Sequence, residues 1–196
     1  MSRRRNMAGR SRLVLIGCAL LSGVACRSEG QTATRYGVGR PATRAEIAAW
    51  DIDVNPSGEG LPAGRGTAAQ GARVFAAKCA ACHGAEGEGL AAAPALVGRE
   101  PREGFPFGQS LKYVRTVGNY WPYATTLYDY INRAMPPDAP GSLEADEIYA
   151  VVAWILSRNE IVGPTTIIDA ASLPRVRMPA RGRFVPDDRR PGAEFR

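Results

Sequence analysis

The hydrophobic pattern near the C-terminal end of the chain predicts a well-defined helix between Ser142 and Arg158. Apolar side chains recur there at intervals of three and four, which places them on one face of a helix. The stripe consists of Ile148, Val151, Val152 and Ile155, with Trp154 at its edge. Ser142 precedes it as an expected N-cap. Acidic residues fill the first turn and Arg158 lies in the last, the order that the helix dipole favours.

Two shorter stretches have the same spacing and predict two further helices. The first covers residues 67–79, with Thr67 as its N-cap. Its shared face consists of Gly71, Val74, Phe75 and Lys78. The second covers residues 123–135 and has Leu127, Tyr128 and Ile131 on one side. It must end before Pro136 and Pro137, because proline lacks the N–H and clashes with the preceding turn. The three helices predict an all-α domain.

The rest of the chain lacks a periodic pattern of comparable strength. Residues 84–118 are rich in glycine and proline and are expected to form a loop. Before the first predicted helix, four apolar residues are expected to fasten an irregular strap to the core: Ile47, Trp50, Ile52 and Val54. From Asn159 onward the chain is rich in proline and arginine, which indicates an extended, solvated tail.

The distribution of charge along the chain separates an N-terminal signal from the remaining residues. The formal charge is +6, but five arginines lie within the first dozen residues and are followed by an apolar run, residues 13–25. This is the pattern of a secretion signal, too short to span a bilayer. Its removal would leave a nearly neutral chain and no argument for nucleic-acid binding. The expected organisation is signal peptide 1–25, flexible tether 26–41, helical domain 42–160 and extended tail 161–196.

The signal leaves two outcomes open for the exported chain. Cleavage before Cys26 would give an N-terminal cysteine of the kind that carries the lipid of a bacterial lipoprotein. Gly23 fits poorly where such signals usually have leucine, and an alternative site at Cys18 leaves a very short apolar core. The other outcome is simple release into the periplasm. Either way, the protein enters a compartment where thiols are normally oxidised or capped.

The candidate chemistry lies in the stretch CAACH, which begins at Cys79 and contains the single histidine of the chain, His83. On a helix, side chains three and four residues apart face the same way, so that Cys79 and Cys82 present two neighbouring thiols with His83 beside them. A haem attached through both vinyl groups needs two thioether bonds and one imidazole in this arrangement. The C-x-x-C-H spacing is the attachment motif of c-type haem, and the sequence predicts one haem c per chain.

Three other uses of these residues fit the sequence less well. A structural zinc ion needs four cysteine or histidine ligands, and the mature chain has only Cys79, Cys82, His83 and Cys26. A thioredoxin-like Cys-x-x-Cys belongs beside a βαβ pattern, which is not found here. A plain disulfide would not require the histidine.

A sixth protein ligand to the iron must be a methionine, lysine, tyrosine or similar group, because the chain has no second histidine. Met1 and Met7 leave with the signal, so that Met135 and Met178 remain. Met135 follows a predicted helix and precedes two prolines, and it is the favoured ligand over Met178 in the tail. The alternative for either is a gap-filling core thioether. A Met/His pair raises the potential and fills both axial positions, which favours electron transfer over substrate chemistry.

Groups around the haem are partly indicated as well. A ligating imidazole needs an acceptor for its other N–H, and in AAAPALVG the carbonyl of Pro94 is the expected one, with Leu96 packing on the ring. Trp121, in the aromatic stretch NYWPY, is expected to wall the haem. Its neighbours Tyr120 and Tyr123, with Arg115, are candidates for contacts to the propionates.

With these residues in place, the chain resembles the monohaem c-type cytochromes. It is most similar to the cytochrome subunits of bacterial sulfite dehydrogenases and the related sulfane dehydrogenases. The stretch VGNYWPYATTLYDYINRAMP is far more specific for this resemblance than the haem motif, and the matching segments cover most of the chain after about Gly39. The resemblance implies a cytochrome c-like haem domain with irregular N- and C-terminal extensions.

The resemblance also implies a role. In that family a periplasmic molybdopterin enzyme oxidises the sulfur compound, and the haem subunit carries electrons to another cytochrome or an oxidase without turnover of its own. Cys79 and Cys82 would be the thioether attachments, His83 the proximal ligand and Met135 the distal ligand. The tail departs from the family at Ala180 and Arg181, which weakens its expected contacts with a partner. Two other hypotheses remain, an independent electron shuttle and an open-site haem enzyme or sensor.

Overall fold

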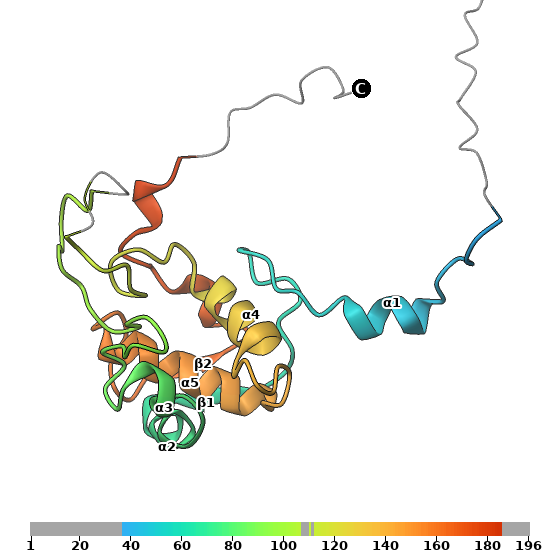
Figure 1. Cartoon of the computed structure of the whole chain (residues 1–196), viewed down its shortest axis with the longest axis horizontal. Coiled ribbons are helices and arrows are strands. Elements are labelled where there is room, and N and C mark those ends of the chain that lie inside the picture. Colours follow the sequence, from blue (N-terminus) through green and yellow to red (C-terminus); the bar gives the residue numbers. More distant parts are fainter. Residues whose placement is uncertain (1–36, 107–109, 111, 186–196) are drawn as a thin grey trace, which may run out of the picture. The chain divides into compact units, whose positions relative to one another are not determined.

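The computed structural model describes residues 37–106, 110 and 112–185. The predicted signal peptide, Cys26 and most of the tether lie outside the described residues. The chain divides into two units, Met1–Pro41 and Ala42–Arg196, and all the elements below belong to the second (Figure 1). In the described part of the chain, no helix is both long and apolar enough to cross a membrane.

Helix α5 (Ala145–Arg158) is the centre of this unit. Residues 148–156 are all buried, because elements pack against α5 on several sides. Two helices and a small sheet contact it: α2 (Ala68–Lys78), α4 (Ala124–Ala134), β1 (Arg65–Thr67) and β2 (Ile167–Asp169). The helix begins after Glu144 rather than at the predicted Ser142. There the Glu147 carboxylate accepts a hydrogen bond from the Glu144 N–H, at 3.0 Å.

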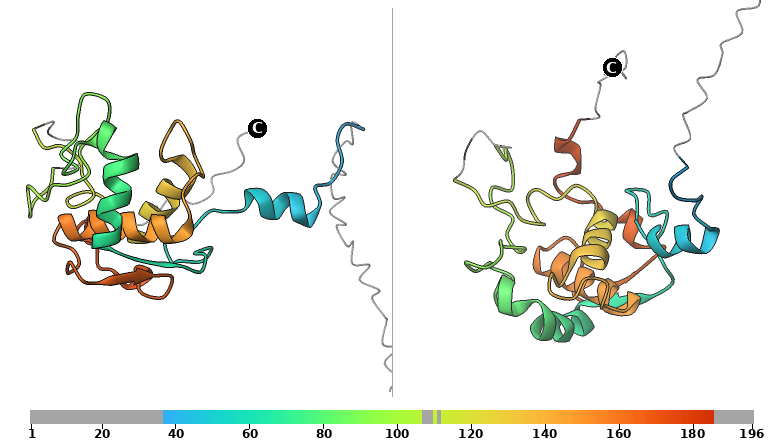
Figure 2. Two further views of the ribbon diagram at one scale, coloured as in Figure 1. Left: turned by 90° about the horizontal axis from the view of Figure 1, so that it is seen from below. Right: turned by 45° about the vertical axis from the view of Figure 1, so that its right-hand side comes forward.

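The crossing of α2 over α5 depends on one glycine (Figure 2). A Cβ on Gly71 would overlap the carbonyl oxygen of Ala150, so that the two backbones meet only because this side chain is absent. One turn further along, Phe75 stacks on Trp154 with ring centroids 3.9 Å apart. Thr67 caps α2 as predicted and shares reciprocal hydrogen bonds with Gln70, an arrangement that satisfies N–H groups left unpaired at a helix start.

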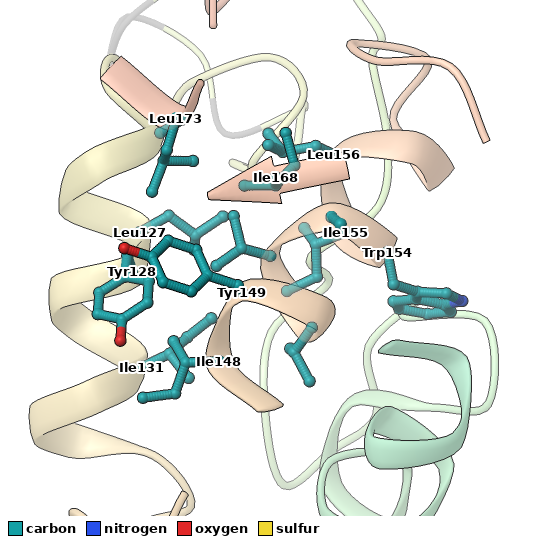
Figure 3. Packing of buried hydrophobic residues seen from close by; sticks show 14 of the residues in the cluster. Leu127, Tyr128, Ile131, Ile148, Tyr149, Trp154, Ile155, Leu156, Ile168 and Leu173 are labelled. Carbon is teal, nitrogen blue, oxygen red and sulfur yellow. The ribbon is translucent and has the colours of Figure 1, made fainter. Parts of the chain in front are cut away.

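Helix α4 packs on another side of α5 through large apolar and aromatic side chains (Figure 3). Tyr128 of α4 lies against Tyr149 of α5 with ring centroids 4.6 Å apart. The Tyr149 hydroxyl donates to the carbonyl of Pro62 at 2.9 Å, and burial raises the pKa of this phenol to about 12. The helix ends at Ala134, directly before Met135 and Pro136, in agreement with the predicted stop.

The segment after α5 is packed on the domain, where the sequence indicated a solvated tail. Strand β2 pairs antiparallel with β1, and Gly66 lies opposite Ile168. The short 3₁₀ helices η1 (Leu173–Arg175) and η2 (Arg181–Arg183) follow. Apolar side chains along this segment are buried: Ile168, Leu173, Met178 and Ala180. The segment is rich in proline and arginine, but these few apolar residues fasten it to the core.

The segment before β1 also differs from the predicted strap. Residues 44–50 form helix α1 (Arg44–Trp50), which Thr43 caps together with Glu46. Of the four apolar residues expected to hold the strap, only Val54 is buried, whereas Ile47, Trp50 and Ile52 are exposed. The described structure nevertheless confirms the all-α class, because the strands are only three residues each.

Asp129 of α4 joins this segment to the domain. Its buried carboxylate accepts hydrogen bonds from the Val54 N–H at 2.8 Å and from Arg133 Nε at 2.9 Å. Burial alone would raise the pKa of Asp129, but the hydrogen bonds from Arg133 and Val54 outweigh it and the pKa is lowered. The ionised carboxylate is therefore the form that stabilises the fold.

We expect Gly71→Ala to lower the free energy of unfolding by about 1–3 kcal/mol, because overpacking at a tight contact costs this much. Helix propensity alone would favour alanine by about 1 kcal/mol. A less stable Gly71→Ala protein would therefore show that the steric overlap outweighs helix propensity. Gly182→Ala is the matched control, since a Cβ there meets nothing within 4 Å. Chemical denaturation measures both variants. Equal stability of Gly71→Ala and wild type would contradict the close helix contact.

We expect Asp129→Asn to be less stable than the wild type at neutral pH. A lowered folded pKa means that the contribution of Asp129 is present above its unfolded pKa, about 3.9, and is lost as the pH falls through its folded pKa. The difference between the two proteins should therefore shrink in acid. Thermal unfolding across pH measures it, with the exposed Asp138→Asn as control. A difference that persists unchanged in acid would show that the Asp129 charge is not responsible.

Candidate haem site

The two cysteines and the histidine lie at a break between two helices. Helix α2 ends at Lys78, and the single-turn helix α3 (Ala80–His83) follows. The carbonyl of Cys79 accepts hydrogen bonds from the N–H groups of Cys82 at 3.1 Å and His83 at 3.0 Å. Both thiols are free and half-buried. The local backbone thus presents two thiols and one imidazole within a single turn.

The ring of His83 is oriented by a hydrogen bond to the backbone. His83 Nδ1 lies 2.8 Å from the carbonyl oxygen of Pro94, and this is the contact expected from the sequence. A carbonyl can only accept, so that Nδ1 carries the proton and Nε2 is the nitrogen left with a free lone pair. An imidazole fixed in this way has both the tautomer and the orientation that a metal ligand needs.

The loop that supplies the Pro94 carbonyl is folded back on the residues after His83. The Gly87 carbonyl accepts from Leu96 at 2.8 Å and from Val97 at 2.9 Å, and Gly89 donates to the His83 carbonyl at 2.7 Å. Gly89 has φ +85°, and a Cβ there would lie 2.5 Å from the Ala95 nitrogen. Glycine is therefore required where the two parts of the loop meet.

Four of the residues assigned to the haem from the sequence are partly buried beside the hydrophobic core. Cys79, Leu96, Trp121 and Met135 pack against the margin of the hydrophobic core and are partly buried. The indole N–H of Trp121 donates to Thr126 Oγ1 at 3.0 Å, which fixes the ring. The chain thus supplies two thiols, an oriented imidazole and a partly buried thioether, which are the donor types that a covalently bound haem needs.

Met135 and Met178 differ sharply in their surroundings. Met178 is 4% exposed and enclosed in the core cluster, so that its sulfur has little surface for another group. Met135 directly follows α4 and is only partly buried. Of the two candidates, Met135 is the less buried.

The environment of Cys79 also bears on the thioredoxin-like alternative. Burial raises the pKa of the Cys79 thiol to about 11, although the charge of Lys78 acts in the opposite direction. Cysteines of redox-active Cys-x-x-Cys motifs have lowered pKa values, because the thiolate is the reactive form. A thiol that stays protonated at neutral pH is unsuited to disulfide exchange.

Comparisons with known proteins identify the family. Residues 66–155 match the family described as "Cytochrome C oxidase, cbb3-type, subunit III". The crystal structure of the sulfane dehydrogenase SoxCD from Paracoccus pantotrophus contains a chain that is 39% identical, with a TM-score of 0.68. The match covers 79% of this chain and 73% of that one. A comparison with curated proteins gave no significant match. The chain belongs to the c-type cytochromes.

This cytochrome resembles the cytochrome subunit of sulfane and sulfite dehydrogenases, as the sequence indicated. The family implies haem c as the cofactor and electron transfer as the function. The haem motif and the loop that orients His83 lie inside the matched region, residues 66–155. The segment after α5 lies beyond that region.

Other predicted residues of this cytochrome contact neighbouring protein groups. The guanidinium of Arg115 lies 4.9 Å from the ring centroid of Tyr120, and that of Arg181 lies 5.2 Å from the ring centroid of Tyr123. Arg183 donates to the carbonyls of Asn119 at 3.0 Å and Arg102 at 2.7 Å. Arg181 and Arg183 therefore hold the segment against the domain, whereas the sequence indicated an extended, solvated tail.

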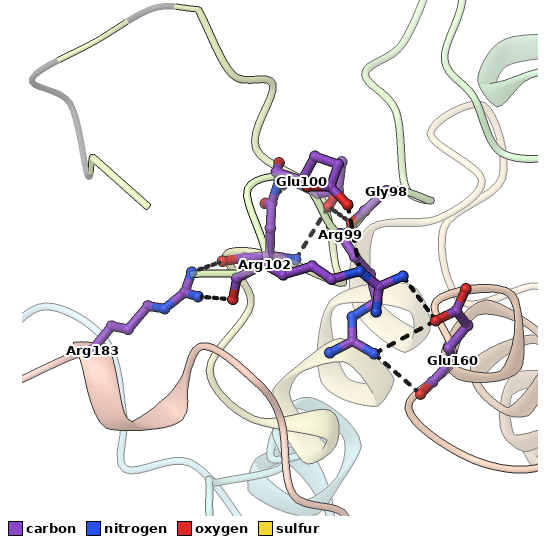
Figure 4. A network of polar contacts seen from close by, with 8 residues as sticks. Gly98, Arg99, Glu100, Arg102, Glu160 and Arg183 are labelled. Atoms are coloured by element: carbon purple, nitrogen blue, oxygen red, sulfur yellow. Dashed lines mark hydrogen bonds and ion pairs between the residues drawn. The ribbon is translucent and has the colours of Figure 1, made fainter. Parts of the chain in front are cut away.

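Sequence reasoning missed one group of residues around the loop of Pro94. Asn159, at the end of α5, forms hydrogen bonds with the backbone of Leu96 and Gly98. Arg99 and Arg102 reach Glu160 next to it (Figure 4). The only signal in the sequence was an asparagine directly after a predicted helix, which is common at helix ends and does not indicate a distant partner.

Proposed function

We propose that this cytochrome is the haem subunit of a periplasmic molybdenum-dependent dehydrogenase that oxidises a sulfur compound. It would accept single electrons from the catalytic subunit and pass them to another cytochrome or an oxidase, with no turnover of its own. The similarity to a chain of the sulfane dehydrogenase supports the partner. The hydrogen bond from His83 Nδ1 to the Pro94 carbonyl, beside two free thiols, is the observation that carries the haem site.

Each residue of the site has a defined task in this proposal. Cys79 and Cys82 would attach the haem through thioether bonds, and His83 Nε2 and the sulfur of Met135 would hold its iron. When bound, haem c supplies a one-electron couple between ferric and ferrous iron. With His83 and Met135 both holding the iron, a substrate would find no free position there, and the site would serve electron transfer.

Two features of the protein surroundings would favour the ferrous state of the haem, and one would oppose it. The thioether of Met135 stabilises ferrous iron and raises the potential. Leu96 and Trp121 bring apolar surface, in which the additional charge of ferric iron is less well solvated. The Pro94 carbonyl acts in the opposite direction, since its hydrogen bond makes the imidazole of His83 more basic. The reduction potential results from the balance of these effects.

The location follows from the predicted export signal. Covalent haem attachment of this type takes place outside the cytoplasm, in agreement with a signal over residues 1–25. The mature chain would be periplasmic, either released or held at the membrane by a lipid on Cys26. In both forms it can meet a soluble catalytic subunit and a second electron carrier.

We expect Met135→Ala to abolish the weak far-red absorption band that sulfur ligation gives to ferric haem c. The ferrous variant should then bind carbon monoxide readily, because its sixth position is open. Met178→Ala is the matched control and should keep the band while losing about 2–5 kcal/mol of stability, the cost of truncating a buried methionine. Loss of the band in Met178→Ala alone would make Met178 the ligand. A wild type that lacks the band and binds carbon monoxide would indicate an open-site haem protein.

We expect the affinity-tagged full chain, expressed in its own host, to co-purify with a protein that contains molybdenum. Sulfite or thiosulfate should reduce the haem of this preparation, and metal analysis should find molybdenum. Cells grown with tungstate in place of molybdate are the control, because their complex should form without reducing the haem. A cytochrome that elutes alone and that neither substrate reduces would favour an independent electron shuttle.

A further inference from the structure

Three buried polar side chains surround the loop next to His83. Asn159 is 1% exposed, Asn119 2% and Thr116 7%. They come from the end of α5 and from the segment before α4, and all three direct hydrogen bonds to the backbone of residues 96–100. Polar groups buried in this way are costly unless they are paired, so their pairing with one short loop ties that loop firmly in place.

Asn159 makes the central contacts. Its Oδ1 accepts from the Gly98 N–H at 2.9 Å, and its Nδ2 donates to the Leu96 carbonyl at 3.1 Å. The same Nδ2 also donates to the Ile155 carbonyl at 2.8 Å, inside α5. The side chain therefore fastens the loop to the end of the central helix, two residues from the carbonyl that orients His83.

Thr116 and Asn119 hold the loop from its other side. The Thr116 hydroxyl donates to the Gly98 carbonyl, and the neighbouring Val117 N–H donates to the Leu96 carbonyl at 3.1 Å. Asn119 Nδ2 donates to the Glu100 carbonyl at 2.7 Å. The loop groups that these residues contact all lie between two and six residues after Pro94.

Glu160 reinforces the attachment at the surface. It has φ +55°, and no other non-glycine residue in the described part of the chain has a positive φ. Its carbonyl accepts from Arg99 at 3.3 Å, and its carboxylate accepts from Arg102 at 3.0 Å (Figure 4). A residue in the left-handed region costs of order 1 kcal/mol or more, so the surrounding contacts must hold it there.

We propose that Asn159 and Thr116 are positioning residues for His83, which act through the loop of residues 94–98 to set the reduction potential. By fixing Leu96 and Gly98 they hold the Pro94 carbonyl on His83 Nδ1. This hydrogen bond makes the imidazole more basic, which favours ferric iron and lowers the potential. The inference rests on the proposed role of His83 as the proximal ligand.

The test compares three variants of the full haem-loaded chain. Asn159→Ala removes both loop contacts, and Thr116→Val removes one with little change of volume. Asn55→Ala is the matched control, because Asn55 also organises a loop through its side chain, with hydrogen bonds from Ser57 and Glu59. Two readouts are measured, the reduction potential and the solvent exchange rate of the His83 Nδ1 proton, the latter by NMR of the ferrous protein.

We expect Asn159→Ala to raise the potential and to speed this proton exchange about tenfold, which corresponds to about 1.4 kcal/mol, the size of one lost hydrogen bond. Thr116→Val should raise the potential and speed the proton exchange as well, but by less. If Asn159→Ala does not fold, Thr116→Val alone tests the proposal. Asn55→Ala should lower stability alone.

Two results would overturn the proposal. One is a wild-type potential and exchange rate in folded Asn159→Ala and Thr116→Val proteins. The other is an equal shift in Asn55→Ala, which would assign the effect to general stability. A wild type without histidine-ligated haem would instead refute the proposed function, and the two failures can therefore be told apart.

Discussion

The hydrogen bond between His83 Nδ1 and the Pro94 carbonyl is the constraint on which the site depends. The C-x-x-C-H turn places two thiols and an imidazole together, but a short helix alone does not decide which way the ring points. The carbonyl lies eleven residues further along the chain, and it reaches His83 only because Gly87 and Gly89 let the loop fold back. The chemistry of one turn thus depends on the shape of the loop that follows it.

Helix α5 connects this loop to the stability of the whole domain. Its middle packs against α2 and α4, where Gly71 permits close contact and Tyr149 lies on Tyr128. Its C-terminal end holds the loop through Asn159. A rigid site suits electron transfer, because metal ligands that keep their positions in both oxidation states keep the reorganisation energy low. The core that stabilises the fold is thus also connected to the loop beside His83.

The sequence predicted the parts that depend on local pattern. Periodicity located α2, α4 and α5 to within two or three residues, and the spacing of Cys79, Cys82 and His83 indicated the site. What it missed depends on distant contacts. Strands of three residues have no period to detect, and Ile168 is buried where β2 pairs with the distant strand β1. The role of Asn159 was hidden for the same reason, because its partners lie about sixty residues earlier.

The central claim is that Cys79, Cys82 and the oriented His83 hold one covalent haem, and intact-mass spectrometry of the exported chain under denaturing conditions tests it most directly. The account predicts a single species heavier than the processed polypeptide by one haem, with the added mass on the peptide that contains both cysteines. A folded, colourless protein with the bare polypeptide mass would contradict it.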